Sequence, residues 1–153
     1  YQDVRELLTN FRSKLGQGDL QAAIESTVER FRRQTGIQTD LRFGGDEGGP
    51  LPPEQQLQVL FILQEALSNV RKHSEAGQVL VSVNNERDFS LLIQDDGQGY
   101  DPAEVAARGE SHVGLHIMQE RAARMRAMIK LESQPGAGTR VALTLPGSER
   151  QAA

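Results

Sequence analysis

The sequence contains no cysteine and no apolar run long enough to cross a bilayer. Without cysteine the chain has neither a disulfide framework nor a thiolate metal site, which fits a reducing compartment. A membrane-spanning helix needs about 20 apolar residues, and the N-terminus lacks the apolar stretch of a signal peptide. We therefore expect a soluble chain.

The chain also lacks a basic excess. It carries 17 Lys and Arg against 21 Asp and Glu, which gives a net charge of −4 and a pI near 5.4. A duplex nucleic-acid binder usually shows a basic excess on at least one face, so we expect no nucleic acid among the partners. The 153 residues show no internal repeat, and 37% of them are hydrophobic, which is enough to bury one core.

The motifs of several well-known active sites are missing too. There is no G-x-x-x-x-G-K-S/T phosphate loop and no G-x-G-x-x-G after a strand. The zinc-protease motif H-E-x-x-H, the hydrolase motif G-x-S-x-G and the eukaryotic protein-kinase signatures are also absent. These absences argue against the classical nucleotide and hydrolase sites.

The apolar periodicity predicts a series of helices and strands. Amphipathic helices are expected from Val4 to Leu15 and at about 20–35, 54–74 and 115–127. Strands are expected at 37–43, 78–84, 89–95, 128–133 and 139–146, the last two joined by a turn at 134–138. This order predicts an α+β fold, a two-layer sandwich with helices packed on one face of a mixed, mainly antiparallel sheet.

The expected helix at 54–74 carries an unusual polar stripe in the segment QEALSNVRKHS. Glu65, Asn69 and His73 are spaced i, i+4 and i+8, and Lys72 lies beside them. A separate apolar stripe occupies the core-facing positions Leu60, Leu63, Leu67 and Val70. An acid, an amide and two basic groups on one stripe indicate either a ligand pocket or a solvated polar face.

Glycine-containing segments are further candidate sites. IQDDGQGYD (93–101) leaves a strand with two acids, although an exposed turn with glycines at positive φ would look the same. SHVGLHIMQERA (111–122) places Gly114 before a helix, whose free N–H groups could receive phosphate oxygens. PGAGTRV (135–141) is more typical of a hairpin turn than of a ligand loop.

The order of these segments is more specific than any one of them. E-x-x-x-N-x-x-K-H on a helix, D-x-G-x-G after a strand, a glycine at a helix start and G-x-G-T before a strand follow one another. This order resembles the ATP-binding domain of bacterial sensor histidine kinases, whose Bergerat fold is shared with gyrase, Hsp90 and MutL. RELLTNFRSKL, QEALSNVRKHS and GLHIMQERA look like the nitrate/nitrite sensor kinase branch. The resemblance covers about residues 1–146.

The resemblance implies that the polar stripe binds the phosphates of ATP and Mg²⁺. Asn69 would supply an amide oxygen to Mg²⁺, a hard cation that prefers oxygen ligands. Glu65 would orient a metal-bound water or act as a base for the acceptor imidazole. Lys72 and His73 would face the polyphosphate. Glu65 and Asn69 are therefore the implied catalytic residues.

The same resemblance assigns the adenine base to the end of the second hairpin strand. Asp95 would accept a hydrogen bond from the exocyclic amine and so select ATP over GTP, and Thr139 would reach the adenine side through its hydroxyl. Gly97 and Gly99 would let the backbone approach the nucleotide closely. Asp96 stands where many relatives have asparagine, and we expect a lesser, structural part for it.

A mobile ATP lid is implied at residues 100–113, after which Gly114 and Leu115 would open the helix that meets the phosphates. Relatives with a fuller second glycine box carry more glycines ahead of this helix than the present chain does. The resemblance further divides the chain into the end of a dimerisation hairpin, an ATP-binding catalytic domain and a disordered tail, at residues 1–16, 17–146 and 147–153.

The implied function is transfer of the ATP γ-phosphoryl group to a histidine on a dimerisation domain, for relay to a response regulator. Family acceptor histidines lie upstream on that hairpin, so His73, His112 and His116 are not acceptor candidates. The parent protein is expected to be a membrane-bound homodimer with this domain in the cytoplasm. The alternatives are an ATPase of the same fold and a non-catalytic module that senses nucleotide.

Overall fold

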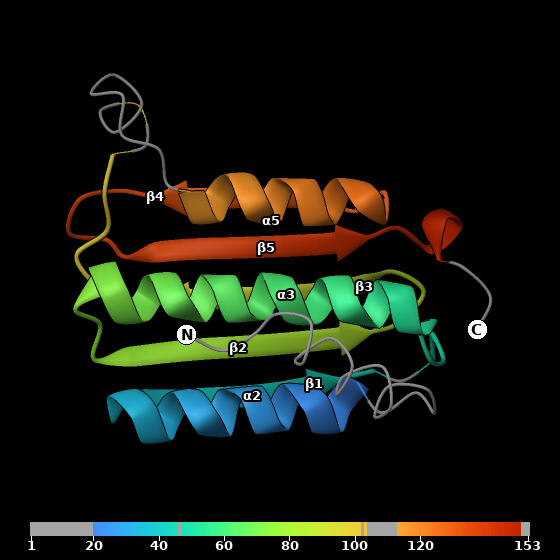
Figure 1. The fold of residues 1–153 in the computed structure, drawn as a ribbon, viewed down its shortest axis with the longest axis horizontal. Coiled ribbons are helices and arrows are strands. Elements are labelled where there is room, and N and C mark those ends of the chain that lie inside the picture. Colours follow the sequence, from blue (N-terminus) through green and yellow to red (C-terminus); the bar gives the residue numbers. More distant parts are fainter. Residues whose placement is uncertain (1–19, 46, 102, 104–112, 151–153) are drawn as a thin grey trace.

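A mixed sheet of five strands forms one layer of the structure (Figure 1). The structure is a computed structural model that describes residues 20–45, 47–101, 103 and 113–150, without the side chains of residues 73, 74, 113 and 114. The strands β1 to β5 are Gln38–Gly44, Gln78–Asn85, Phe89–Asp95, Met128–Ser133 and Thr139–Leu145, and their spatial order is β1-β2-β3-β5-β4. Only β1 and β2 pair in parallel, so the expected mixed, mainly antiparallel sheet is confirmed.

Three helices form the second layer, side by side on one face of the sheet (Figure 1). They are α2 (Leu20–Thr35), α3 (Pro53–Asn69) and α5 (Val113–Arg124), with α3 in the middle. Because α3 has a helix on either side and the sheet beneath it, the expected apolar stripe of Leu60, Leu63, Leu67 and Val70 is fully in the core. The two-layer α+β sandwich is thus confirmed. No helix in the described part of the chain has the length and apolarity that a bilayer crossing requires.

Alternation along the central strands directs every second side chain toward the helices. Register partners across β2, β3 and β5 form two buried rows, Val81, Ile93 and Val141, then Val83, Leu91 and Leu143. Two residues beyond Ile93 the same alternation reaches Asp95, which pairs with Thr139. The inward face of the sheet therefore changes from apolar to polar at this end, and that change defines the site.

The helix expected at 54–74 is correct only as far as Asn69. Val70–Ser74 form a π-helical turn, η1, and Glu75 follows it with a left-handed φ of 53°. The wider i→i+5 turn was not visible in the periodicity, because Val70 continues the apolar spacing of α3 into it. The expected helix at 115–127 likewise begins at Val113 and ends at Arg124.

The disordered tail expected from residue 147 is wrong for its first residues. Gly147–Glu149 form a 3₁₀ turn, η2, and the guanidinium of Arg150 donates to the carbonyl oxygens of Gly48 and Gly49. These contacts join the end of the chain to a loop about a hundred residues earlier, which no local pattern could reveal. The expected first helix, most of the expected lid and residues 151–153 lie outside the described residues.

Candidate functional site

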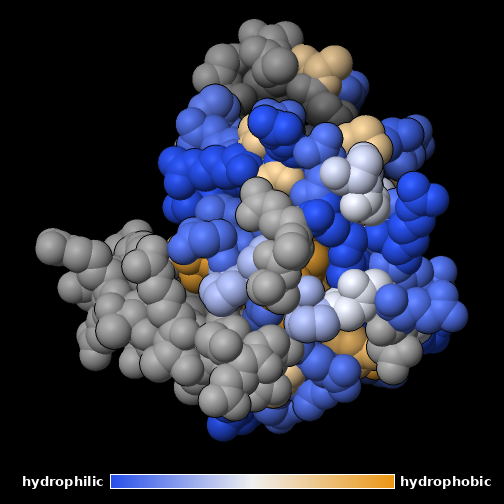
Figure 2. All heavy atoms as spheres, turned by 90° about the vertical axis from the view of Figure 1, so that its right-hand side faces the viewer, coloured by the Kyte–Doolittle hydropathy of each residue, from blue (hydrophilic) through white to orange (hydrophobic). Residues whose placement is uncertain are grey.

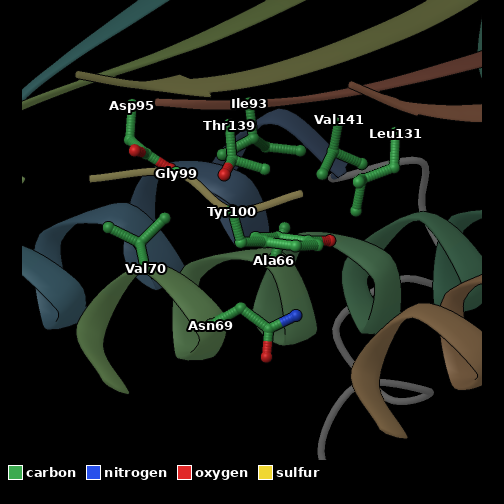
Figure 3. A pocket seen from close by; sticks show the side chains of 10 residues that line it. All are labelled: Ala66, Asn69, Val70, Ile93, Asp95, Gly99, Tyr100, Leu131, Thr139 and Val141. Atoms are coloured by element: carbon green, nitrogen blue, oxygen red, sulfur yellow. The ribbon is translucent and has the colours of Figure 1, made fainter. Parts of the chain in front are cut away.

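A pocket that is partly open to solvent lies between the last turn of α3 and the inward face of the sheet (Figure 3). Its apolar lining comes from Ala66, Val70, Ile93, Leu131 and Val141. Its other lining residues are Asn69, Asp95, Gly99, Tyr100 and Thr139. An apolar cleft with a few converging polar groups is the usual form of a small-ligand site.

Asp95 is the charged group of this pocket and is only 6% exposed. Its Oδ1 accepts the main-chain N–H of Gly97 at 2.8 Å. Burial raises the pKa of the Asp95 carboxyl from its ordinary value; hydrogen bonds from the N–H groups of Gly97 and Thr139 oppose this shift, and the charge of Asp96 adds to it. A desolvated carboxylate held in one orientation is a strong acceptor for a donor that enters the pocket.

Asp96 is not in the lining of this pocket, and it has the structural part expected for it. Its Oδ1 accepts the main-chain N–H groups of Gly77 and Gln78, each at 2.9 Å. Gly77 directly precedes β2, and Gln78 is the first residue of that strand. Asp96 therefore fixes where the chain that leaves α3 enters the sheet.

Asn69 lies across the pocket from Asp95, at the last residue of α3 (Figure 3). Its carboxamide makes no hydrogen bond with the described residues. Glu65 lies one turn earlier, half-buried and outside the pocket lining, and Lys72 is exposed within the π-helical turn. His73 lies in the same turn, and its side chain is not among those described. Among the stripe residues whose side chains are described, only Asn69 therefore lines this pocket.

The remaining expected residues fall into two groups. Gly97 is outside the pocket lining and donates its main-chain N–H to Asp95. Gly99 and Thr139 line the pocket itself. Gly114 and Leu115 lie in the first turn of α5, so Gly114 is inside that helix rather than before it. Leu115 is not in the pocket lining.

The glycines of the two loops at the site are needed for their packing against each other. A Cβ on Gly99, where φ is +62°, would lie 2.0 Å from the carbonyl oxygen of Gln134. A Cβ on Gly138, at φ +77°, would lie 2.1 Å from the carbonyl oxygen of Asp95. We expected Gly97 and Gly99 to be required for approach of a ligand, but at Gly99 the protein's own backbone already requires glycine. Among residues 97–99, only Gly99 has the positive φ that an exposed turn would need.

Sequence reasoning missed two residues of the site, Tyr100 and Ser133. The ring of Tyr100 extends between the helix side and the sheet side of the pocket (Figure 3), and burial raises the pKa of its hydroxyl. Ser133 lies behind the pocket, and its Oγ accepts the main-chain N–H of Tyr100 at 2.9 Å. The position of Tyr100 directly after D-x-G-x-G was the available signal for it. Ser133 had none, because its role depends on pairing between β4 and β5.

Residues 54–149 match the family of histidine kinase-, DNA gyrase B- and HSP90-like ATPases. The match includes α3, the site-bearing strands and both glycine loops. The chain therefore belongs to this family of ATP-binding domains, as the order of its motifs predicted.

Curated relatives narrow the comparison to sensor kinases. The chain is 34% identical over 148 residues to the sensor protein NarQ homolog of Haemophilus influenzae, covering 95% of this chain and 25% of that protein. It is 35% identical over 147 residues to the nitrate/nitrite sensor protein NarX of Escherichia coli, covering 92% of this chain and 23% of that protein. The expected resemblance to the nitrate/nitrite branch is confirmed, and the chain spans about a quarter of the length of these relatives.

A solved structure shows the same fold. The histidine kinase domain of the Erythrobacter litoralis EL346 blue-light activated histidine kinase superposes with a TM-score of 0.67 at 18% identity. The superposition covers 86% of this chain and 66% of that chain. The expected Bergerat fold is thus confirmed.

Proposed function

We propose that this chain is the ATP-binding catalytic domain of a two-component sensor histidine kinase. It transfers the γ-phosphoryl group of ATP to a histidine on a dimerisation domain, for relay to a response regulator, and its parent is a membrane-bound homodimer. The observation that carries the proposal is the buried carboxylate of Asp95 opposite the carboxamide of Asn69 in one apolar pocket.

Asp95 fits the recognition of adenine. The exocyclic amine of adenine is a donor, whereas guanine carries a carbonyl oxygen at the same ring position. A buried carboxylate attracts the first and repels the second, and the low dielectric of the pocket strengthens both effects. The apolar walls of the pocket suit the faces of a purine ring, and the ring of Tyr100 adds an aromatic surface to them.

Asn69 fits the binding of Mg²⁺ together with phosphate oxygens. An amide oxygen is a ligand that this cation accepts, and Mg²⁺ in nucleotide sites usually takes few ligands from the protein. The Asn69 carboxamide makes no hydrogen bond with the described residues, so binding would break none. Mg²⁺ would neutralise charge on the transferring phosphate, while Lys72, His73 and the N–H groups near Gly114 and Leu115 would bind the polyphosphate.

Glu65 is the proposed base. In the transfer, the bond from the γ-phosphorus to the bridging oxygen breaks, a bond to the imidazole nitrogen forms, and ADP leaves with the bond electrons. The proton lost by the imidazole passes to Glu65. Positioning and charge neutralisation supply most of the catalysis in such a reaction.

Calorimetric titration with ATP, ADP and GTP, with and without Mg²⁺, tests the binding half of the proposal. We expect ATP and ADP to bind, GTP to bind far more weakly, and Mg²⁺ to strengthen ATP binding. Asn69→Ala should lose the Mg²⁺-dependent part of the affinity, whereas Glu65→Gln should keep nucleotide binding and lose transfer. Equal loss of binding in both variants would contradict these roles.

Incubation with γ-labelled ATP tests the transfer half. The chain alone should stay unlabelled, and a separately supplied dimerisation domain of a related sensor kinase should gain acid-labile label. Label on His73, His112 or His116 of this chain would refute the proposal. ATP binding without transfer to a folded acceptor domain would favour the nucleotide-sensing alternative.

A further inference from the structure

Ser133 is a buried hydroxyl that joins the two loops behind the pocket. It is the last residue of β4 and is 9% exposed. Its Oγ accepts the N–H of Tyr100 at 2.9 Å, lies 3.1 Å from the carbonyl oxygen of Gly138, and lies 2.9 Å from Oγ1 of Thr139. One side chain therefore contacts the main chain of Tyr100 and the hydroxyl of Thr139, two residues that line the pocket.

The hydrogen bond from Ser133 to the carbonyl of Gly138 assigns a direction to the other contacts. The carbonyl of Gly138 can only accept, so the single proton of the Ser133 hydroxyl is used there. The contact between Ser133 and Thr139 then needs its proton from Thr139. With that proton turned toward Ser133, the lone pairs of Thr139 Oγ1 remain for a donor in the pocket.

We propose that Ser133 is a positioning residue that makes the Thr139 hydroxyl an acceptor toward the pocket and so contributes to the choice of adenine. Thr139 and Asp95 are register partners at the ends of adjacent strands, so two acceptors lie side by side at the base end of the pocket. An exocyclic amine offers donors to such a pair, whereas a carbonyl in its place is repelled. This inference rests on the nucleotide-binding function proposed above and concerns which base that site takes.

Ser133→Ala tests the inference with ADP and inosine diphosphate as probes, because the inosine base carries a carbonyl where adenine has its amine. Without Ser133 the Thr139 hydroxyl is free to rotate and donate to that carbonyl. We expect ADP affinity to fall about 2- to 10-fold, as the loss of one neutral hydrogen bond implies, while affinity for inosine diphosphate stays level or rises. Ser90→Ala, at the far end of β3, is the matched control and should leave both affinities unchanged.

If Ser133 had only a structural role, Ser133→Ala would lower the affinities for both nucleotides by the same factor. An unchanged ratio between ADP and inosine diphosphate therefore overturns the inference. In the double variant Ser133→Ala/Thr139→Val, the ratio should match that of Thr139→Val alone, since Ser133 acts through Thr139.

Two further outcomes separate this inference from the proposed function. A wild-type chain that binds neither nucleotide refutes both, whereas normal ADP binding with an unchanged ratio in Ser133→Ala refutes the inference alone. If Ser133→Ala folds too poorly to titrate, Thr139→Val tests the inference instead. Removal of the Thr139 hydroxyl must reduce the discrimination between ADP and inosine diphosphate. Full discrimination in a folded Thr139→Val variant would overturn the inference.

Discussion

The two ends of the sheet both carry a hollow beneath a glycine-containing loop, but they differ in what their polar groups do. The hollow at the start of β3 is the larger of the two. Figure 2 faces this end and shows hydrophobic residues as separate orange areas within a largely hydrophilic surface. Its polar side chains are already engaged, Gln21 with Glu25 and Asn85 with Gly49. The buried carboxylate of Asp95, and the carboxamide of Asn69 that makes no hydrogen bond with the described residues, therefore distinguish the candidate site, rather than its volume.

The loops at the two ends are also held in different ways. Arg150 holds the loop at the start of β3, with its guanidinium bonded to the side chain of Asn85 and to the carbonyl oxygens of Glu86, Gly48 and Gly49. At the other end the two glycine loops are joined by the Ser133 hydroxyl and by a main-chain hydrogen bond from Gly136 to Gln98, and backbone packs directly on backbone at Gly99 and Gly138. The candidate site is thus held by close contact, which leaves its charged group available to a ligand.

The largest effect is expected from breaking that close contact. Gly138→Ala would place a Cβ against the carbonyl of Asp95, whereas Gly136→Ala, in the same turn at φ +78°, meets nothing within 4 Å. We expect Gly136→Ala to cost about 1–2 kcal/mol from the left-handed backbone alone. Gly138→Ala should cost about 1–3 kcal/mol more. Urea unfolding of both variants measures the difference, and equal costs would show that the contact is not tight.

The second effect concerns the carboxylate of Asp95. Asp95→Asn should lower ADP affinity about 10- to 150-fold, because a hydrogen bond to a charged group contributes about 1.5–3 kcal/mol. Folding should survive, since the asparagine oxygen can still accept the N–H of Gly97. Calorimetry measures the affinity and thermal unfolding the stability. Wild-type ADP affinity in this variant would refute the adenine assignment.

The third effect tests the opposite end. Arg150→Ala should lower the free energy of unfolding by about 1–2 kcal/mol, a modest value for several hydrogen bonds because the guanidinium is partly exposed. ADP affinity should not change, since Arg150 is remote from the pocket. Arg150→Lys is the control, because lysine keeps the charge but cannot reach all four oxygens. A parallel loss of ADP affinity would show that the two ends are coupled.

The smallest effect is a pH dependence at Asp95. Burial raises the folded-state pKa of this carboxyl above its ordinary value of 3.8, so protonation favours the folded chain at low pH and that contribution is lost as pH rises through the raised pKa. Adenine needs the ionised form. ADP affinity should therefore begin to fall on acidification before an ordinary aspartate would protonate. Titrations across this range measure it, and Asp95→Asn should show no such dependence.

The sequence by itself determined the elements of this protein and its family. Strand alternation and helix periodicity are local consequences of which side chains avoid water, so the sheet and the three described helices followed from them. The ordered motifs then identified the ATP-binding family.

Only the tertiary structure decided how those elements serve the site. The contact of Ser133 with Tyr100 spans 33 residues and that of Arg150 with Gly48 spans 102, and neither leaves a periodic signal. The requirement for glycine at Gly99 and Gly138 likewise comes from backbone that packing brings against them. The physical reason is that such contacts depend on how segments distant in sequence pack together, and a local pattern of hydrophobicity does not encode that packing.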